Sequence, residues 1–266
     1  MILPKRENLY KEAHRKFYNY DSIEYLSSNK KSIESVYYIS RINEIINIVE
    51  KSIPLKGTVL DIGCAQGNIP LILAEKGYNV VGVDYISDGL SYAFLKYEHG
   101  NCNFVAGNAE KLPFKNNFNC IIISEFLEHV NKPELFLNLF NNFLEENGIL
   151  IITTPNGSSI LNIKVPNYTS FKLNNDCKKI GPEKKDHVFN FNMFEIKNLL
   201  VESKFEIIEN RYINSYILNP VTYFIYKNLP IGVVYKLNSY FSNIPIFKKY
   251  LCSTILFAAK RKINID

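Results

Sequence analysis

The chain alternates between short apolar runs and longer segments whose apolar residues recur at helical spacing. Four runs are almost continuously apolar, at residues 58–62, 79–83, 118–124 and 149–153. Runs of this length, rich in Val, Ile and Leu, are typical of strands buried on both faces of a parallel sheet. Residues 68–76 and 133–143 lie between these runs and repeat their apolar positions every three or four residues, which predicts helices. This alternation predicts an α/β fold with a doubly wound sheet.

Amphipathic segments also precede this core. Residues 32–53 carry apolar side chains mostly on one helical face, so we expect a helix packed beside the sheet. Residues 11–18 are a second, more basic helix candidate. Together, residues 1–55 are expected to form an N-terminal helical extension.

The segment after the fourth run carries a helix-capping pattern. Asn192 and Glu195 are spaced so that each side chain can bond the other's backbone N–H group. This spacing predicts a helix from Asn192 to about Ser203. Residues 205–209 then alternate between apolar and polar side chains, which predicts a further strand.

The turn after the first apolar run carries the main chemical signal. The run ends with Asp61, and Gly63 and Gly67 follow in a tight loop before the next helix. Glycine allows the positive φ angles of such a turn and leaves room for a ligand against the backbone. The second run ends at Asp84, about 20 residues after the loop, where nucleotide-binding α/β folds hold a ribose diol.

The charge of Asp61 separates two classes of ligand. A carboxylate at the end of the first strand would repel the pyrophosphate of a dinucleotide, and the third glycine of a dinucleotide-binding loop is missing. The same carboxylate suits a cationic ligand without phosphate, such as S-adenosylmethionine with its sulfonium and amino groups. A dinucleotide-dependent oxidoreductase is therefore the disfavoured alternative.

The segment from Thr58 to Gly67 resembles motif I of the class I S-adenosylmethionine-dependent methyltransferases, with Ala65 in place of the middle glycine. Further segments resemble motifs of the same family in the same order, at residues 107–114, 124–130 and 153–156. The resemblance covers roughly residues 55–210. It implies a Rossmann-like sheet that is mostly parallel, with an antiparallel final strand.

The resemblance also implies where the domain continues beyond this core. Residues 253–260 look like the final, antiparallel strand of the family. Residues 56–266 are then the methyltransferase domain, and residues 214–250 are an apolar insertion before its last strand.

The resemblance assigns a role to each residue of the cofactor site. It places the loop under the methionine part at Asp61, Gly63, Cys64, Ala65 and Gly67. It places Asp84 at the ribose hydroxyls, Tyr85 beside the adenine, Asn108 and Ala109 at the adenine edge, and Glu125 also at the cofactor. Asn108 replaces the usual aspartate, but its amide oxygen can accept the same hydrogen bond.

Residues 124–127, Ser-Glu-Phe-Leu, bear on which atom is methylated. Amino-methyltransferases carry Asn or Asp followed by Pro-Pro-aromatic at this place, and that signature is absent. The sequence therefore favours an oxygen or carbon acceptor, and we expect O-methylation of a small-molecule, sugar or lipid-linked acceptor. His129 and His187 are the candidates for the general base that removes the acceptor's proton. For each histidine, a structural hydrogen bond that fixes a loop is the alternative.

A metal site is a further hypothesis. Glu125, Glu128, His129 and His187 resemble the metal-ligand set of the small-RNA 3′-terminal 2′-O-methyltransferases. Ubiquinone-type O-methyltransferases are similar in their Glu-His pair and in their use of a metal. Imidazole and carboxylate ligands would suit Mg²⁺, Mn²⁺ or Zn²⁺. Metal-free members of the family share much of this pattern, so we expect no metal and keep a metal-assisted RNA 2′-O-methyltransferase as an alternative.

The end of the chain has an unusual charge distribution. From Tyr212 through Ile265 there is no Asp or Glu, whereas seven Lys or Arg residues and many Tyr and Phe residues occur there. This excess accounts for the net charge of +5. Residues 214–250 are expected either to form apolar helices that close the substrate pocket, or to belong to a peripheral membrane surface spanning 214–262. A non-catalytic, membrane-associated binding module stays an alternative, and DNA is not an expected partner.

Length and cysteine usage set the broad class. A chain of 266 residues can bury one substantial core as a single decorated α/β domain. Its five cysteines show no paired metal spacing, which indicates reduced thiols. No apolar run reaches the roughly 18 residues that a membrane span needs. We therefore expect a cytoplasmic protein, with peripheral membrane contact left open.

Overall fold

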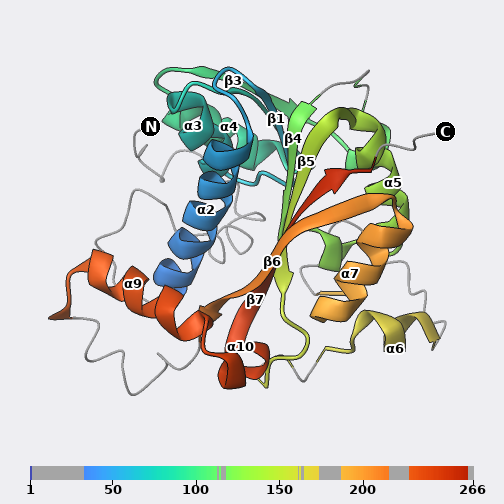
Figure 1. Cartoon of the computed structure of the whole chain (residues 1–266). Coiled ribbons are helices and arrows are strands. Elements are labelled where there is room, and N and C mark those ends of the chain that lie inside the picture. The colour runs from blue at the N-terminus through green and yellow to red at the C-terminus, as the bar shows by residue number, and fades with distance from the viewer. Residues whose placement is uncertain are drawn as a thin grey trace.

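The computed structural model describes residues 1, 33–112, 114, 118–160, 162, 165–173, 187–215 and 228–262. Within these residues the chain forms one seven-stranded sheet with helices on both faces (Figure 1). The strands are β1 (Thr58–Ile62), β2 (Asn79–Asp84), β3 (Asn101–Ala106), β4 (Phe118–Ser124), β5 (Leu144–Pro155), β6 (Phe205–Ser215) and β7 (Cys252–Arg261). The helices are α2 (Ile33–Ser52), α3 (Asn68–Glu75), α4 (Ser87–Lys96), α5 (Pro133–Phe143), α6 (Tyr168–Leu173), α7 (Met193–Glu202), α9 (Ile231–Ser242) and α10 (Pro245–Leu251). Two short 3-10 turns, η3 (Ala109–Lys111) and η4 (Leu127–His129), follow β3 and β4.

The strands lie in the order β3-β2-β1-β4-β5-β7-β6. Strands β1 to β5 pair in parallel, and β7 runs antiparallel between β5 and β6. The predicted doubly wound, mostly parallel sheet with an antiparallel final strand is thereby confirmed. Because β1 to β5 run in one direction, their carboxyl ends meet at the same edge of the sheet.

Alternate residues of each central strand pack on opposite faces of the sheet. In β4, Ile121 and Ile123 belong to the core beneath α5 and α7, whereas Ile122 belongs to the core beneath α2 and α3. All three side chains are fully buried. Each such side chain contributes on the order of 2 kcal/mol of burial free energy. Helix α2 covers the sheet as expected from residues 32–53, while the helix candidate at 11–18 lies outside the described residues.

The capping pattern at Asn192 is confirmed, whereas the strand that follows this helix is longer than expected. The Asn192 Oδ1 accepts the backbone N–H of Glu195 at 3.0 Å, and the Glu195 carboxylate accepts that of Asn192 at 2.8 Å. Strand β6 runs to Ser215 and not to residue 209, because it pairs with β7 along nearly its whole length. The insertion therefore begins after Ser215.

Strand β5 also begins earlier than expected. The apolar run predicted a strand from residue 149, but Leu144 already pairs with Phe118 of β4. The register then shifts before Cys120 pairs with Ile149, so the extra residues bulge out of a strand that has already started.

The insertion places α9 and α10 at the carboxyl edge of the sheet (Figure 1). The start of β7 pairs there with the end of β5, through Thr254 and Pro155. Helix α9 packs against α2 through Val234 and Val36. The insertion thus contains two helices, as one of the two expectations held, while their closing of a substrate pocket stays a prediction. None of the described helices is long and apolar enough to cross a membrane.

Asn238, whose side chain is buried, joins α9 to β6 and to α2 through hydrogen bonds. Its Oδ1 accepts the backbone N–H of Ser215 at 3.0 Å, and its Nδ2 donates to Ser40 Oγ at 3.2 Å. We expect Asn238→Ala to lower the free energy of unfolding by about 1–3 kcal/mol, because buried polar groups lose these partners. Urea unfolding measures the difference. Asn243→Ala, at the exposed end of the same helix, is the control and should change stability by less than about 0.5 kcal/mol. Equal losses in both variants would contradict this account.

Candidate active site

The loop between β1 and α3 has the conformation expected of a cofactor loop. Gly63 and Gly67 have φ angles of 73° and 71°, and the N–H of Gly63 donates to Val83 O at 2.8 Å. A Cβ atom on Gly67 would lie 2.6 Å from the Cβ of Ala93, so the backbone requires glycine there. Ala65 also has a left-handed φ of 47°, which costs a residue with a Cβ about 1–2 kcal/mol.

Asp84 lies at the end of β2, directly against this loop. Its Oδ2 accepts the N–H of Ala65 at 2.7 Å, and its Oδ1 accepts the N–H of Ile86 at 2.9 Å. Burial raises the pKa of the Asp84 carboxyl, while these two N–H groups act in the opposite direction. Each carboxylate oxygen has a second lone pair, so a fixed Asp84 can still accept hydrogen bonds from ligand hydroxyls.

Asp61 and Cys64 form the buried floor of the loop. The Asp61 side chain is 2% exposed, and burial together with the charge of Asp84 raises its pKa well above the ordinary value. Burial also raises the pKa of the Cys64 thiol, which keeps it protonated. Two acidic groups in one corner disfavour a pyrophosphate, as predicted from the position of Asp61.

The expected adenine residues are spread along the neighbouring loops. Asn108 caps η3, since its Oδ1 accepts the N–H of Glu110 at 2.9 Å, and only one lone pair of that oxygen remains for a ligand. Ala109 is buried and Tyr85 is 61% exposed. The structure thus places Tyr85 at the rim, and the adenine contacts stay predictions.

Glu125 is held in a strained position at the end of β4. Its φ is 53°, and its backbone N–H donates to Thr153 O at 2.8 Å. Its Oε2 lies 3.3 Å from Nη1 of Arg41 on α2. Among the described residues, the buried Glu125 Oε1 and Arg41 Nε have no hydrogen-bond partner. Buried polar atoms without partners are uncommon, and this pair indicates a place for a polar ligand.

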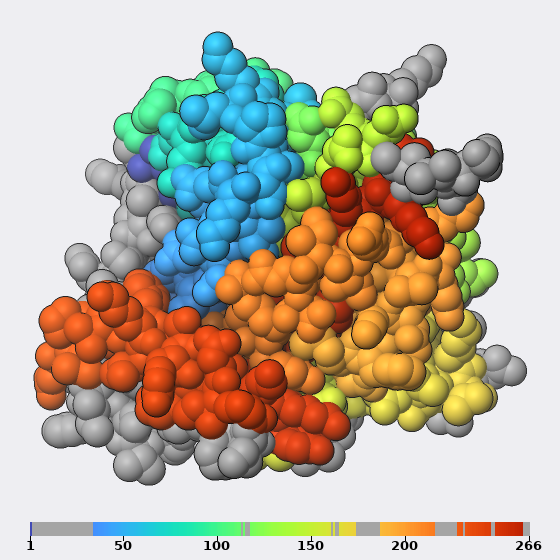
Figure 2. Space-filling model, viewed as in Figure 1, coloured from blue at the N-terminus to red at the C-terminus, as the bar shows by residue number. Residues whose placement is uncertain are grey.

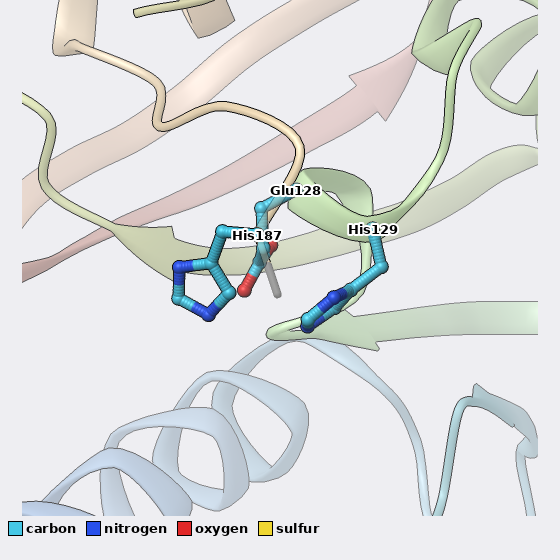
Figure 3. A group of neighbouring side chains, drawn as sticks. All are labelled: Glu128, His129 and His187. Atoms are coloured by element: carbon cyan, nitrogen blue, oxygen red, sulfur yellow. The ribbon is translucent and has the colours of Figure 1, made fainter. Parts of the chain in front are cut away.

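Glu128, His129 and His187 come together in one group (Figure 3), and Glu128 is close enough to Glu125 and Arg41 to interact with their charges. One candidate ligand atom from each residue lies within 4.8 Å of the others, and the two imidazole rings are 5.0 Å apart. Thr154 Oγ1 donates to Glu128 Oε2 at 2.9 Å, whereas Glu128 Oε1 is buried without a partner among the described residues. Glu125 is not part of this group, so three of the four hypothetical metal ligands are gathered.

The surroundings of Glu128 and His129 favour the neutral forms of these two side chains. Burial, and the charge of Glu125, raise the pKa of Glu128 well above its ordinary value. Burial, and the neighbouring His187, lower the pKa of His129 to about 4. The His129 side chain also has an exposed side, and water reaching the ring limits this shift. His129 is therefore an uncharged imidazole at neutral pH, able to accept a proton.

Sequence reasoning missed two residues of the site, Arg41 and Asn190. Arg41 is a lone basic residue close in sequence to the buried Ile39 and Ile42 of α2. Asn190 stands between two fully buried phenylalanines and contacts His187. Both residues stand out in the sequence, but the residues that they contact cannot be identified without the fold.

Comparison with known proteins identifies the family of the chain. A family described as "Methyltransferase domain" matches residues 55–211, more than half of the chain. The chain belongs to this family and is a class I S-adenosylmethionine-dependent methyltransferase. The resemblance noted in the sequence is confirmed.

Individual relatives are more distant. The chain is 29% identical to a "Ubiquinone biosynthesis O-methyltransferase" of Rickettsia canadensis over 137 residues, which are 50% of this chain and 56% of that protein. A protein of the same name from Rickettsia bellii is 27% identical over 66% of this chain and 77% of that protein. A solved S-adenosylmethionine-dependent methyltransferase from Archaeoglobus fulgidus has a TM-score of 0.60 and 18% identity, over 93% of this chain and 100% of that one. The chain thus spans about half the length of the first relative, and the structural likeness shows the fold.

The lowered pKa of His129 makes a direct prediction. In a nuclear magnetic resonance titration, His129 should titrate below its ordinary 6.5, towards about 4, and His187→Gln should move this midpoint upwards. The unfolded chain then binds this proton more readily than the folded chain, so acid should reduce stability between about pH 6.5 and 4. A midpoint at or above 6.5 would contradict the lowering of this pKa by burial and by His187.

Proposed function

We propose that this protein transfers a methyl group from S-adenosylmethionine to a hydroxyl oxygen of a small-molecule acceptor. The observation that carries the proposal is a pair of histidines, His129 and His187, at the same sheet edge as Asp84 and the glycine loop. S-adenosylmethionine supplies an electrophilic methyl group on its sulfonium. The chain has to orient the acceptor and receive its proton.

The cofactor roles proposed from the sequence fit the loop geometry. Asp84, held by two N–H groups, would accept hydrogen bonds from the ribose hydroxyls. The loop of Gly63 and Gly67 leaves its backbone open to the methionine part. Asn108, Ala109 and Tyr85 would border the adenine.

Arg41 and Glu125 suit the amino-acid end of the cofactor. An α-amino acid group carries one carboxylate, which needs donors, and one ammonium, which needs acceptors. Arg41 Nε and Glu125 Oε1 are the buried donor and acceptor that lack partners among the described residues. Arginine matches a carboxylate in both charge and geometry. We therefore add Arg41 to the proposed cofactor residues.

The histidines and Glu128 form the proposed acceptor side. A neutral imidazole can accept the hydroxyl proton as the oxygen attacks, which typically contributes 10²–10⁴-fold to a rate. Glu128, favoured as a neutral acid, can hold the acceptor through a hydrogen bond without adding a repulsive charge.

The names of the relatives favour a small-molecule hydroxyl over the RNA alternative. Both relatives described above are named for O-methylation in ubiquinone biosynthesis. The non-catalytic alternative lacks support, because the loop, Asp84 and the histidine pair all keep usable geometry.

A divalent cation held by Glu128, His129 and His187 is the second candidate, supported by their 4.8 Å grouping. It would withdraw charge from the acceptor oxygen, and assays with EDTA or added Mg²⁺ separate the two.

Calorimetry with S-adenosylmethionine and S-adenosylhomocysteine tests the cofactor site. Asp84→Ala and Arg41→Gln should each weaken affinity about 10-fold or more, because each removes charge-assisted hydrogen bonds. Glu146→Ala removes an exposed acid from the opposite end of β5 and should leave affinity unchanged. Unchanged affinity in Asp84→Ala would remove that residue from the site, and failure of the unmodified protein to bind either ligand would sink the proposal.

We further propose that the acceptor is lipid-linked and that the carboxyl edge contacts a membrane surface. Tyr240, Tyr250 and Ile160 are 67%, 49% and 50% exposed there, beside exposed Lys248 and Lys249. Figure 2 shows α9 and α10 on the outer surface at this end of the molecule. Aromatic side chains among lysines suit an interface with anionic headgroups. A cytoplasmic location with peripheral contact stays a prediction.

Vesicle binding tests this surface. Replacing Lys248 and Lys249 by Gln should weaken binding to phosphatidylglycerol-containing vesicles about 10-fold or more, since each lysine contributes about 1 kcal/mol. Replacing the exposed Lys51 and Lys56, near the amino end of β1, is the matched control. Equal losses in both variants, or no binding to anionic vesicles, would contradict the proposal.

A further inference from the structure

His187 has a hydrogen-bond partner outside the group that it forms with Glu128 and His129. Its Nδ1 lies 3.2 Å from Oδ1 of Asn190, three residues further along the chain. We infer that Asn190 is a positioning residue that holds His187 in the tautomer with its proton on Nδ1. The Nε2 atom then keeps a lone pair for the acceptor's proton. The inference rests on the proposed function in that it takes His187 as the base.

The orientation of the Asn190 side chain follows from its second contact. Its Nδ2 donates to the backbone oxygen of Asn162 at 3.4 Å. A carbonyl oxygen can only accept, so the amino end of the amide must face Asn162. The carbonyl end is thereby turned to His187. Because this oxygen can only accept as well, the ring must donate from Nδ1.

The backbone of Asn190 is fixed on both sides. Its N–H donates to Pro166 O at 2.9 Å, and its carbonyl accepts the N–H of Tyr168 at 3.0 Å. The side chain is 2% exposed, and its neighbours Phe189 and Phe191 are fully buried with ring centroids 4.9 Å apart. A side chain held in this way has no room to rotate away from His187.

The tautomer matters because a neutral imidazole has one donor and one acceptor nitrogen. A ring with its proton on Nε2 would present a donor to the site and could not take a proton there. Glu128 and His129 face His187 from η4 (Figure 3), and neither forms a hydrogen bond of the kind that Asn190 provides. Asn190 is therefore the described residue whose contact selects the useful tautomer.

Nitrogen-15 spectra of the labelled full chain report the tautomer directly. The chain has four histidines, and the spectrum of His187→Gln identifies the signals of His187. In its uncharged form, His187 should show a protonated Nδ1 and an unprotonated Nε2. Asn190→Leu should shift the signals towards the Nε2-protonated form, whereas Asn190→Asp, which keeps an acceptor oxygen, should preserve the original tautomer.

Turnover of a small-molecule hydroxyl acceptor links the tautomer to catalysis. Asn190→Leu should lower kcat about 10- to 100-fold without changing cofactor affinity, a fraction of what a general base contributes. Asn190→Asp should restore most of the loss. The inference is overturned if the unmodified protein carries the proton on Nε2, a measurement that needs no variant to fold. It is also overturned if Asn190→Leu leaves both tautomer and kcat unchanged. Failure of the unmodified protein to bind the cofactor in calorimetry would instead contradict the proposed function, because Asn190 is not among the proposed cofactor residues.

Discussion

The parallel pairing of β1 between β2 and β4 is the constraint on which the site depends. Both faces of these strands are buried beneath helices, so ligand-binding polar groups collect at the strand ends. Asp61 pairs with Gly82 and Ile122 one step before that edge, Asp84 ends β2, and Glu125 follows β4. The register of three short strands thereby sets the spacing of three carboxyl groups without any direct contact between them.

Backbone strain and unpartnered polar atoms lower the stability of the fold at this edge, and apolar burial in the core offsets that loss. Ala65 and Glu125 both adopt left-handed backbone conformations, at about 1–2 kcal/mol each. Arg41, Glu125 and Glu128 each keep a buried polar atom without a partner among the described residues. The free energy of burying the strands beneath offsets these costs. A bound ligand would supply the missing hydrogen-bond partners. Strain and missing partners thus coincide with the residues proposed to bind and react.

The parts of the structure that could be predicted from the sequence are those set by local pattern. Continuous Val and Ile runs indicated the strand positions, and the spacing of Asn192 and Glu195 indicated a helix start that the structure confirms. The length of β6 could not be predicted, because pairing with β7 and not its own pattern extends it to Ser215. The approach of Arg41 to Glu125 is equally non-local, since a helix before the first strand meets a loop after the fourth. The cofactor residues were predicted from the resemblance to the methyltransferase family. The inferred tautomer of His187 depends instead on the contacts of Asn190, which only the three-dimensional structure shows.

Helix α2 connects parts of the site that the sequence treats separately. Its Tyr38 hydroxyl accepts from Asn68 Nδ2 at the start of α3, and Arg41 lies 5.4 Å from the centre of the Tyr38 ring. One turn before Arg41, the Tyr37 hydroxyl donates to Ser215 O, where the insertion begins. The same helix thus contacts the glycine loop, the β4 edge and the base of α9. A domain boundary at residue 55 would separate Arg41 from the carboxylate that it neutralises and leave the Glu125 charge unpaired in a partly buried site. Helix α2 is therefore bound to the loop after β4, and a shortened chain that began at β1 would lose the ion pair between Arg41 and Glu125.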